Sequence, residues 1–202
     1  SIMAIAQDEL KRMLAYSTVA QIGYMVLGIG LASSTGLTAT LLHLFNHALM
    51  KGALFLAVGA VVYRLGSVNL RDLAGLGRRM PWTMAAIVIG GLSLIGVPPT
   101  AGFVSKWYLV LATLEQDLWP LALLILLGSL LSLAYVWKIV EAAYFAQPTN
   151  AGEAQAMIRE APLSLLIPVW LLVFANLYFG INTEFTVGVA TQASAMLLGT
   201  GS

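Results

Sequence analysis

The chain alternates between long hydrophobic runs and short polar segments. An α-helix needs about 20 apolar residues to cross a ~30 Å hydrocarbon core, and about five of the runs reach this length. These runs cover residues 13–32, 37–64, 82–114, 118–145 and 163–180. The pattern predicts an all-α fold, a bundle of transmembrane helices in which residues 1–202 form a single transmembrane domain.

The third run is interrupted at residues 96–102, where the sequence reads Gly-Val-Pro-Pro-Thr-Ala-Gly. The adjacent prolines remove two backbone donors, and Pro98 disfavours helical geometry at Val97. An interrupted helix at membrane depth is tolerated only where its backbone lines a cavity or is buried in protein. We therefore expect two half-helices in this run.

The composition supports a membrane protein. Hydrophobic residues make up 59% of the chain and charged residues only 9%, whereas an ordinary soluble domain has roughly 25% charged residues. The absence of cysteine excludes disulfides and thiolate metal sites, and the net charge of +1 gives no indication of nucleic-acid binding. The chain begins without a charged and then apolar signal region, so we expect the start of the protein to be missing.

The basic residues predict the orientation. If the runs alternate in direction, seven of the ten basic residues fall on one side of the membrane and none on the other. The other three, Lys51, Lys106 and Lys138, lie within the runs. By the positive-inside rule, the first residues and the loop at 64–79 are cytoplasmic and the C-terminus lies outside. We expect a multi-pass protein of the inner (plasma) membrane of the cell.

Two histidines and a lysine interrupt the second run at His43, His47 and Lys51. Their four-residue spacing places the side chains along one face of an α-helix, with about 40° of drift per step. An ionisable group in lipid costs about 2.5–3.5 kcal/mol on insertion scales, so its default interpretation is an interior, functional position. Histidine changes charge near neutral pH, and a buried lysine without a compensating charge can release its proton. The three groups are therefore suited to passing protons with intervening waters.

Two other interpretations of the histidines stay open. They can hydrogen-bond to neighbouring helices as buried polar contacts. The His-x3-His pair can also bind zinc or a haem, although no glutamate or cysteine accompanies it as a further ligand.

Lys106 lies one turn beyond the break. The free backbone groups of an interrupted helix can coordinate ions or waters, so a lysine at this place is a candidate proton site. The alternative is a lysine that extends along the helix to the membrane surface.

Further charged residues lie near the ends of the runs. Lys138 and Glu141 are three residues apart, which allows a local ion pair, or Glu141 ends the proton path on the cytoplasmic side. Lys11 belongs to the charged start of the first helix and is the member of it that can point inward. Ser17 and Gln21 can supply polar lining or bonds between helices.

Motifs for catalysis and nucleotide binding are missing from the sequence. No phosphate-binding glycine loop followed by Lys-Ser/Thr is present, which excludes ATP as the energy source of this chain. No serine is paired with a histidine and an acid as a nucleophile would be. We therefore expect no catalytic residue, no metal site and no cofactor of its own.

The motifs resemble those of a known family. The segment at 8–24, the row His43-x3-His47-x3-Lys51-Gly-Ala-Leu-Phe-Leu and the segment at 96–106 resemble the proton-conducting membrane subunits shared by respiratory complex I and multisubunit Na+/H+ antiporters. The resemblance covers nearly the whole chain. Within the family, the segment at 137–145 is most similar to the D-type membrane protein of the Mrp antiporters, with membrane-bound hydrogenase relatives close behind.

The resemblance implies a larger fold with two inverted repeats, of which this chain supplies most of the second as a C-terminal fragment. It implies that Lys106 is the lysine of the broken helix, that His43, His47 and Lys51 form the connecting row, and that Lys11 is the family lysine at the start of its helix.

The implied function is that of a membrane subunit of a multisubunit Na+/H+ antiporter. Its expected partners are other membrane subunits of the same complex, protons, Na+ and the lipid bilayer, with no nucleic acid. The alternative is an antiporter-like proton-pumping subunit of an NADH–quinone oxidoreductase or a membrane-bound hydrogenase, which would make the chain part of an enzyme. A third interpretation is a purely structural scaffold.

Overall fold

The structure is a computed structural model that describes residues 1–66, 68–146 and 158–199. The described residues are almost entirely helical and contain no β-strand. The helices are α1 (Ile2–Ile5), α2 (Leu10–Gly30), α3 (Ser34–Leu65), the 3-10 helix η1 (Leu70–Leu73), α4 (Leu76–Arg79), α5 (Pro81–Ile95), α6 (Ala101–Leu114), α7 (Trp119–Val140), the π-helical turn η2 (Glu141–Phe145), α9 (Leu163–Ile181) and α10 (Glu184–Leu197).

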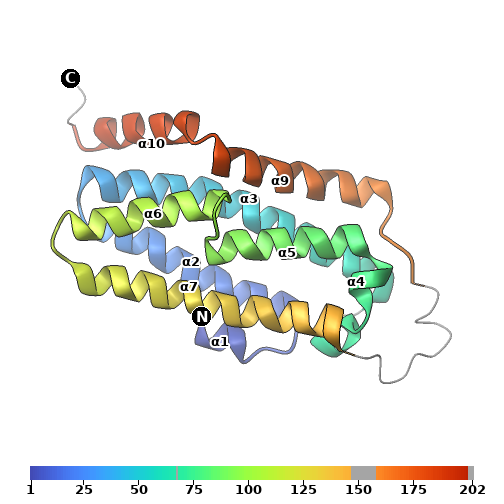
Figure 1. Ribbon diagram of the computed structural model, residues 1–202. Helices are drawn as coiled ribbons and strands as arrows, with labels where there is room; N and C mark the ends of the chain where they lie inside the picture. Colours follow the sequence, from blue (N-terminus) through green and yellow to red (C-terminus); the bar gives the residue numbers. More distant parts are fainter. Residues whose placement is uncertain (67, 147–157, 200–202) are drawn as a thin grey trace.

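The long helices run side by side along one axis (Figure 1). α2, α3 and α7 each cross the bundle as one helix, whereas α5 and α6 follow one another end to end, as do α9 and α10. α3 lies at the centre, packed against α2, α5, α6, α9 and α10. Five of its own polar side chains, those of Thr38, Thr40, His43, Asn46 and Lys51, are buried in the bundle.

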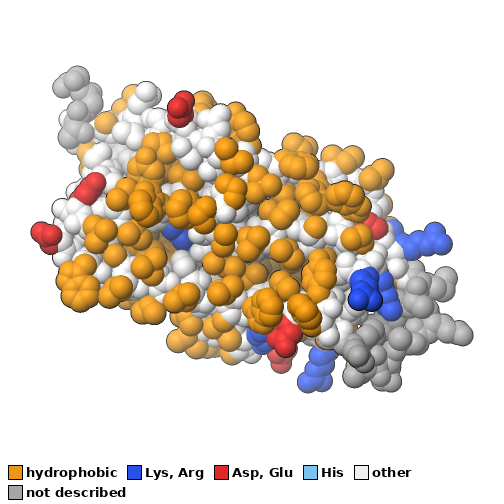
Figure 2. Space-filling view, viewed as in Figure 1, with side chains coloured by type: hydrophobic (Ala, Val, Ile, Leu, Met, Phe, Trp, Pro, Cys, Tyr) orange, Lys and Arg blue, Asp and Glu red, His pale blue; other side chains and the backbone are white. Residues whose placement is uncertain are grey.

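Within the part of the chain that the structure describes, four helical segments are long and apolar enough to cross a membrane by length and composition: Leu10–Gly30, Ser34–Leu65, Trp119–Phe145 and Leu163–Ile181. α5 and α6 are shorter apolar helices. Hydrophobic side chains cover much of the face in Figure 2, while Lys and Arg gather at the end of the bundle near α4. The predicted all-α membrane bundle is confirmed.

The predicted break in the third run is also confirmed. α5 ends at Ile95, and Gly96 adopts a left-handed conformation with φ of 91°. α6 begins at Ala101. The left-handed conformation is accessible to glycine without a steric penalty, which explains how α5 stops within an apolar sequence.

The sequence did not predict α10. The last predicted run ends at residue 180, but Glu184–Leu197 form a further helix against α3. Its buried residues are Thr186, Ala190 and Ser194, and the hydroxyl of Ser194 donates to the carbonyl of Ser34 at 2.9 Å. These small and polar residues produce no hydrophobic stripe, so the helix carries no strong apolar pattern.

The apolar core is divided into two clusters. One contains Leu14, Met50 and Tyr135, and the other contains Tyr24 and Leu109. On α2, α3 and α7, several buried polar residues fall between the positions that the two clusters occupy, and on α6 two more precede the cluster residue Leu109. They are Ser17, Gln21, His43, Asn46, Ser105, Lys106 and Ser132. We call this region the polar layer.

Candidate functional site

Lys51 lies in the bundle interior on α3, with 5% of its surface exposed. Its ammonium donates to the carbonyl oxygen of Leu14 on α2 at 2.7 Å and to the hydroxyl of Ser17. The ammonium also lies 5.7 Å from the centre of the Phe55 ring. All of these partners are neutral, so the positive charge of Lys51 is not balanced by a carboxylate among its hydrogen-bond partners.

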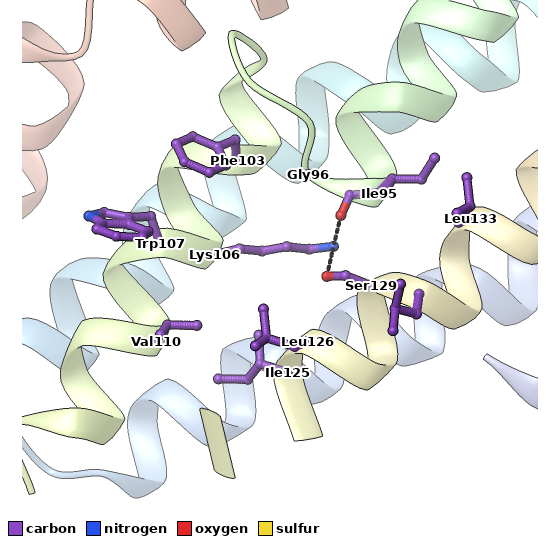
Figure 3. A pocket seen from close by; sticks show the side chains of 11 residues that line it. Ile95, Gly96, Phe103, Lys106, Trp107, Val110, Ile125, Leu126, Ser129 and Leu133 are labelled. Carbon is purple, nitrogen blue, oxygen red and sulfur yellow. Dashed lines mark hydrogen bonds between the residues drawn. The ribbon is translucent and has the colours of Figure 1, made fainter. Parts of the chain in front are cut away.

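Lys106 is equally buried, with 6% of its surface exposed. Its ammonium donates to the carbonyls of Leu94 and Ile95 at 2.8 and 2.9 Å and to the hydroxyl of Ser129 at 3.1 Å. Figure 3 shows the side chain extended from α6 toward Ile95 and Ser129. Leu94 and Ile95 end α5, and a cation at a helix C-terminus satisfies carbonyls that have no partner within the helix.

A pocket of about 390 Å³ lies beside Lys106, between α6 and α7. Apart from Lys106 and Ser129, its lining is mostly apolar and includes Trp107 and Leu126 (Figure 3). The lysine therefore has a polar cradle on one side of its ammonium and an apolar pocket along its stem.

The two histidines continue the site along α3. Their rings are stacked, with centres 6.1 Å apart and planes inclined by 17°. Nδ1 of His43 shares a hydrogen bond of 2.8 Å with the hydroxyl of Ser105, which precedes Lys106 on α6. Nε2 of both His43 and His47 is buried without a hydrogen-bond partner among the described residues. The two histidines thus connect α3 to α6 beside Lys106, and their Nε2 atoms remain able to form hydrogen bonds.

Two asparagines hold the break in place. Asn46 on α3 donates to the carbonyl of Ala101 at 2.7 Å. Oδ1 of Asn176 on α9 accepts from the backbone N–H of Ala101 at 3.1 Å and from the hydroxyl of Ser93 at 2.9 Å. The first peptide of α6 is therefore fastened from two sides. The hydrophobic pattern does not mark these asparagines as site residues, although an isolated asparagine in an apolar run is a usable signal.

Close backbone contact completes the break. A Cβ atom at Gly102 would collide with the backbone carbonyl of Ser93, and one at Gly180 would collide with the backbone from Pro99 to Ala101. Gly180 lies one turn after Asn176 on α9, so one face of α9 packs directly on the break.

The remaining predicted residues have no contact with Lys51, the two histidines or Lys106 among the hydrogen bonds and ion pairs of the described residues. Lys138 donates to the carbonyls of Ile5 and Gln7 at 2.9 and 3.2 Å and lies 3.5 Å from the carboxylate of Asp8. The local ion pair considered between Lys138 and Glu141 is therefore wrong, because Lys138 turns to the segment after α1 and Glu141 is exposed. Lys11 is also exposed rather than directed inward.

The described residues contain no group of three or more His, Cys, Asp or Glu side chains that could hold a metal ion. The zinc interpretation of His43 and His47 therefore lacks further ligands in this part of the chain. What the site offers is buried basic groups, hydroxyls and helix-end carbonyls beside a discontinuous helix. Such an arrangement is typical of membrane proteins that move ions or protons.

Comparison with known proteins identifies the family. Residues 1–132 match the model described as NADH:quinone oxidoreductase/Mrp antiporter, TM, and the chain belongs to this family. It is 42% identical over 201 residues to NADH-quinone oxidoreductase subunit N of Desulforudis audaxviator, which covers 95% of this chain and 40% of that protein. It is 35% identical over 195 residues to Hydrogenase-4 component B of Escherichia coli, which covers 85% of this chain and 28% of that protein.

A solved structure is similar to this chain over nearly its whole length. The chain superimposes on part of the Mrp complex from Dietzia sp. DQ12-45-1b with a TM-score of 0.90 and 28% identity, covering 98% of this chain and 44% of that one. The resemblance to the antiporter-like membrane subunits is therefore confirmed. The chain spans less than half the length of these curated relatives.

Proposed function

We propose that this chain carries protons within an antiporter-like membrane subunit, through Lys51, His47, His43 and Lys106. One observation carries the proposal: both lysines are buried, and their hydrogen-bond partners among the described residues are all neutral. An ammonium group without a nearby carboxylate is costly inside a protein, which favours a functional reason for its presence.

The contacts suggest how the groups exchange protons. Each lysine alternates between ammonium and amine, and oxygen acceptors stabilise its charged form. For Lys106 these acceptors include the last carbonyls of α5, so the C-terminal end of that helix takes the place of a carboxylate. His43 reaches α6 through Ser105, and waters complete the gaps between the rings and the lysines.

The transported ions and the energy source define two candidate assemblies. In the first, the chain belongs to a multisubunit Na+/H+ antiporter, which the similarity to the Mrp complex supports. In the second, it belongs to a proton-pumping redox complex, which the 42% identity to an NADH-quinone oxidoreductase subunit supports. In both, the chain works beside other membrane subunits, and its proton-carrying part is the same.

We also propose a location and an orientation. The protein lies in the inner (plasma) membrane of the cell. By the positive-inside rule, the basic end of the bundle faces the cytoplasm. Glu141, which is exposed near that end, is then placed to exchange protons with the cytoplasm, and Lys11 lies on the same side. Lys138 holds the segment after α1 against α7 and so shapes this entrance.

Substitution of the lysines by arginine tests the proton-carrying role. Arginine keeps the charge and donates to the same carbonyls, but it does not lose its proton in proteins. In the assembled complex reconstituted into vesicles, Lys51→Arg and Lys106→Arg should lower proton-coupled transport by about tenfold or more. Lys51→Met and Lys106→Met serve as smaller replacements, and Arg78→Lys, at an exposed position of α4, is the control.

Transport at the control rate in well-assembled lysine variants would exclude the proposal and favour a structural scaffold. The same vesicles separate the two assemblies. A Na+ gradient drives proton movement if the complex is an antiporter, whereas electron transfer from a reduced donor drives it if the complex is a redox pump.

A further inference from the structure

The interface between α2 and α7 contains a second set of polar side chains, apart from the histidines. Ser17, Gln21 and Tyr24 lie four and three residues apart on α2, which places them on one helix face. Ser129, Ser132 and Tyr135 have a three-residue spacing on α7. We call these six residues the α2–α7 row. All of them are buried except Ser129, which is half-buried.

The row ends at the two lysines. Ser17 accepts a hydrogen bond from Lys51. At the other end, Ser129 accepts one from Lys106 at 3.1 Å, and the Lys106 ammonium lies 5.2 Å from the centre of the Tyr24 ring. The same two groups that the histidines connect through α3 are therefore also connected across α2 and α7.

Hydroxyl groups fill the positions between the ends. The hydroxyl of Tyr135 lies beside those of Ser17 and Ser132. The hydroxyl of Tyr24 lies beside that of Ser129 and donates to the carbonyl of Ile125 at 3.4 Å. A hydroxyl both donates and accepts, so adjacent hydroxyls can pass a proton in either direction.

Gln21 and Tyr135 carry buried polar atoms that water can satisfy in this row. Both side chains are fully buried, and Nε2 and Oε1 of Gln21 and the hydroxyl of Tyr135 have no hydrogen-bond partner among the described residues. A buried polar group left without a partner costs about 1–3 kcal/mol, and proteins normally satisfy such groups with ordered water. Water bound here would bridge the hydroxyls at the two ends of the row.

We propose that the α2–α7 row, with water bound at Gln21 and Tyr135, is a second proton connection between Lys51 and Lys106, parallel to His43 and His47. The inference rests on the proposed function, in which the two lysines exchange protons. In one transfer, the Lys51 ammonium releases a proton to the oxygen of Ser17, and each hydroxyl or water along the row accepts one proton and releases one. The neutral amine of Lys106 accepts the last proton. No group is oxidised or reduced.

The test uses the assembled complex in vesicles and a variant without histidines, His43→Leu with His47→Leu. If the row conducts, this variant retains transport above the level of Lys106→Arg. Adding Tyr135→Phe, which removes only the hydroxyl, then lowers the remaining transport to the Lys106→Arg level. Tyr16→Phe, on the exposed side of α2, is the matched control and leaves the remaining transport unchanged.

Two results would overturn the parallel connection. The first is a histidine-free variant whose transport is already as low as that of Lys106→Arg. The second is a Tyr135→Phe change that lowers the transport of the histidine-free variant no more than Tyr16→Phe does. If Tyr135→Phe fails to assemble, Gln21→Met with Ser132→Ala is measured by the same criteria. A larger slowing in D2O for the histidine-free variant than for the unmodified complex further separates a hydroxyl and water relay from a packing role.

The two proposals fail separately. Unchanged transport in Lys51→Arg and Lys106→Arg contradicts the proton-carrying function itself. Loss of transport in these variants, together with either of the two overturning results, leaves that function intact and removes only the α2–α7 row.

Discussion

Lys106 Nζ on α6 lies 2.9 Å from the carbonyl oxygen of Ile95, the last residue of α5. The side chain thus reaches back across the break and joins the two halves of the discontinuous helix. Its charge lies at the negative end of the α5 dipole, where the last carbonyls have no partner within the helix. A change in the protonation or the position of Lys106 therefore alters its hydrogen bonds to the last carbonyls of α5.

The two buried lysines should differ in their effect on stability. In Lys51→Met the hydroxyl of Ser17 loses a donor but still donates to the carbonyl of Leu14, which also accepts from Thr18, so no buried carbonyl loses its last side-chain donor. In Lys106→Met the carbonyls of Leu94 and Ile95 lose their donor. An unsatisfied buried group costs about 1–3 kcal/mol, so Lys106→Met should melt at a lower temperature than Lys51→Met in detergent. Equal melting temperatures would contradict this role of Lys106 at the end of α5.

Gly102 should not tolerate a side chain. A Cβ atom there would collide with the backbone carbonyl of Ser93, which cannot move aside as a flexible side chain can. Gly102→Ala should therefore destabilise the bundle by about 1–3 kcal/mol and slow transport, because the start of α6 shifts. The control is Gly59→Ala on α3, where the added Cβ has no neighbour within 4 Å. Thermal unfolding of both variants checks the contrast, and similar losses in the two would disprove it.

Asn176 should stabilise the break from α9. Asn176→Leu has a similar volume but leaves the N–H of Ala101 and the hydroxyl of Ser93 without their acceptor. We expect a loss of about 1–3 kcal/mol, seen as a lower melting temperature. Asn182→Leu, at an exposed position just after α9, is the control and should change little. An Asn176→Leu protein as stable as the control would show that the amide is dispensable.

Glu160 should act as the N-terminal cap of α5 from a distant part of the chain. The local cap residue, Met80, has no side-chain oxygen, and the Glu160 carboxylate instead accepts from the N–H of Trp82 at 2.7 Å and the hydroxyl of Thr83 at 2.6 Å. Loss of such a cap costs about 0.5–2 kcal/mol, so Glu160→Ala should lower the melting temperature.

Glu115→Ala is the control for the Glu160 cap, since Glu115 is exposed at the C-terminal end of α6, where removal of a negative charge is neutral or mildly stabilising. Equal losses in the two glutamate variants would mean that the Glu160 carboxylate contributes only as a surface charge.

The sequence alone determined the features that depend on local chemistry. Long apolar runs specify helices that can cross a membrane, and the glycines and prolines of residues 96–102 specify the break. The spacing of His43, His47 and Lys51 places them along one helix face whatever surrounds that helix, and the stacked rings agree with this.

The tertiary structure decided which groups meet. The partners of Lys106, at Ile95 and Ser129, and the partner of Ala101 at Asn176 come from different helices, so no local spacing encodes them. The same reason explains the error at Lys138: a helical spacing of three residues suggested Glu141, but packing of the first residues against α7 brought Asp8 closer. α10 was missed because its buried face is made of small and polar residues, whose burial depends on the contact with α3 rather than on their hydrophobicity.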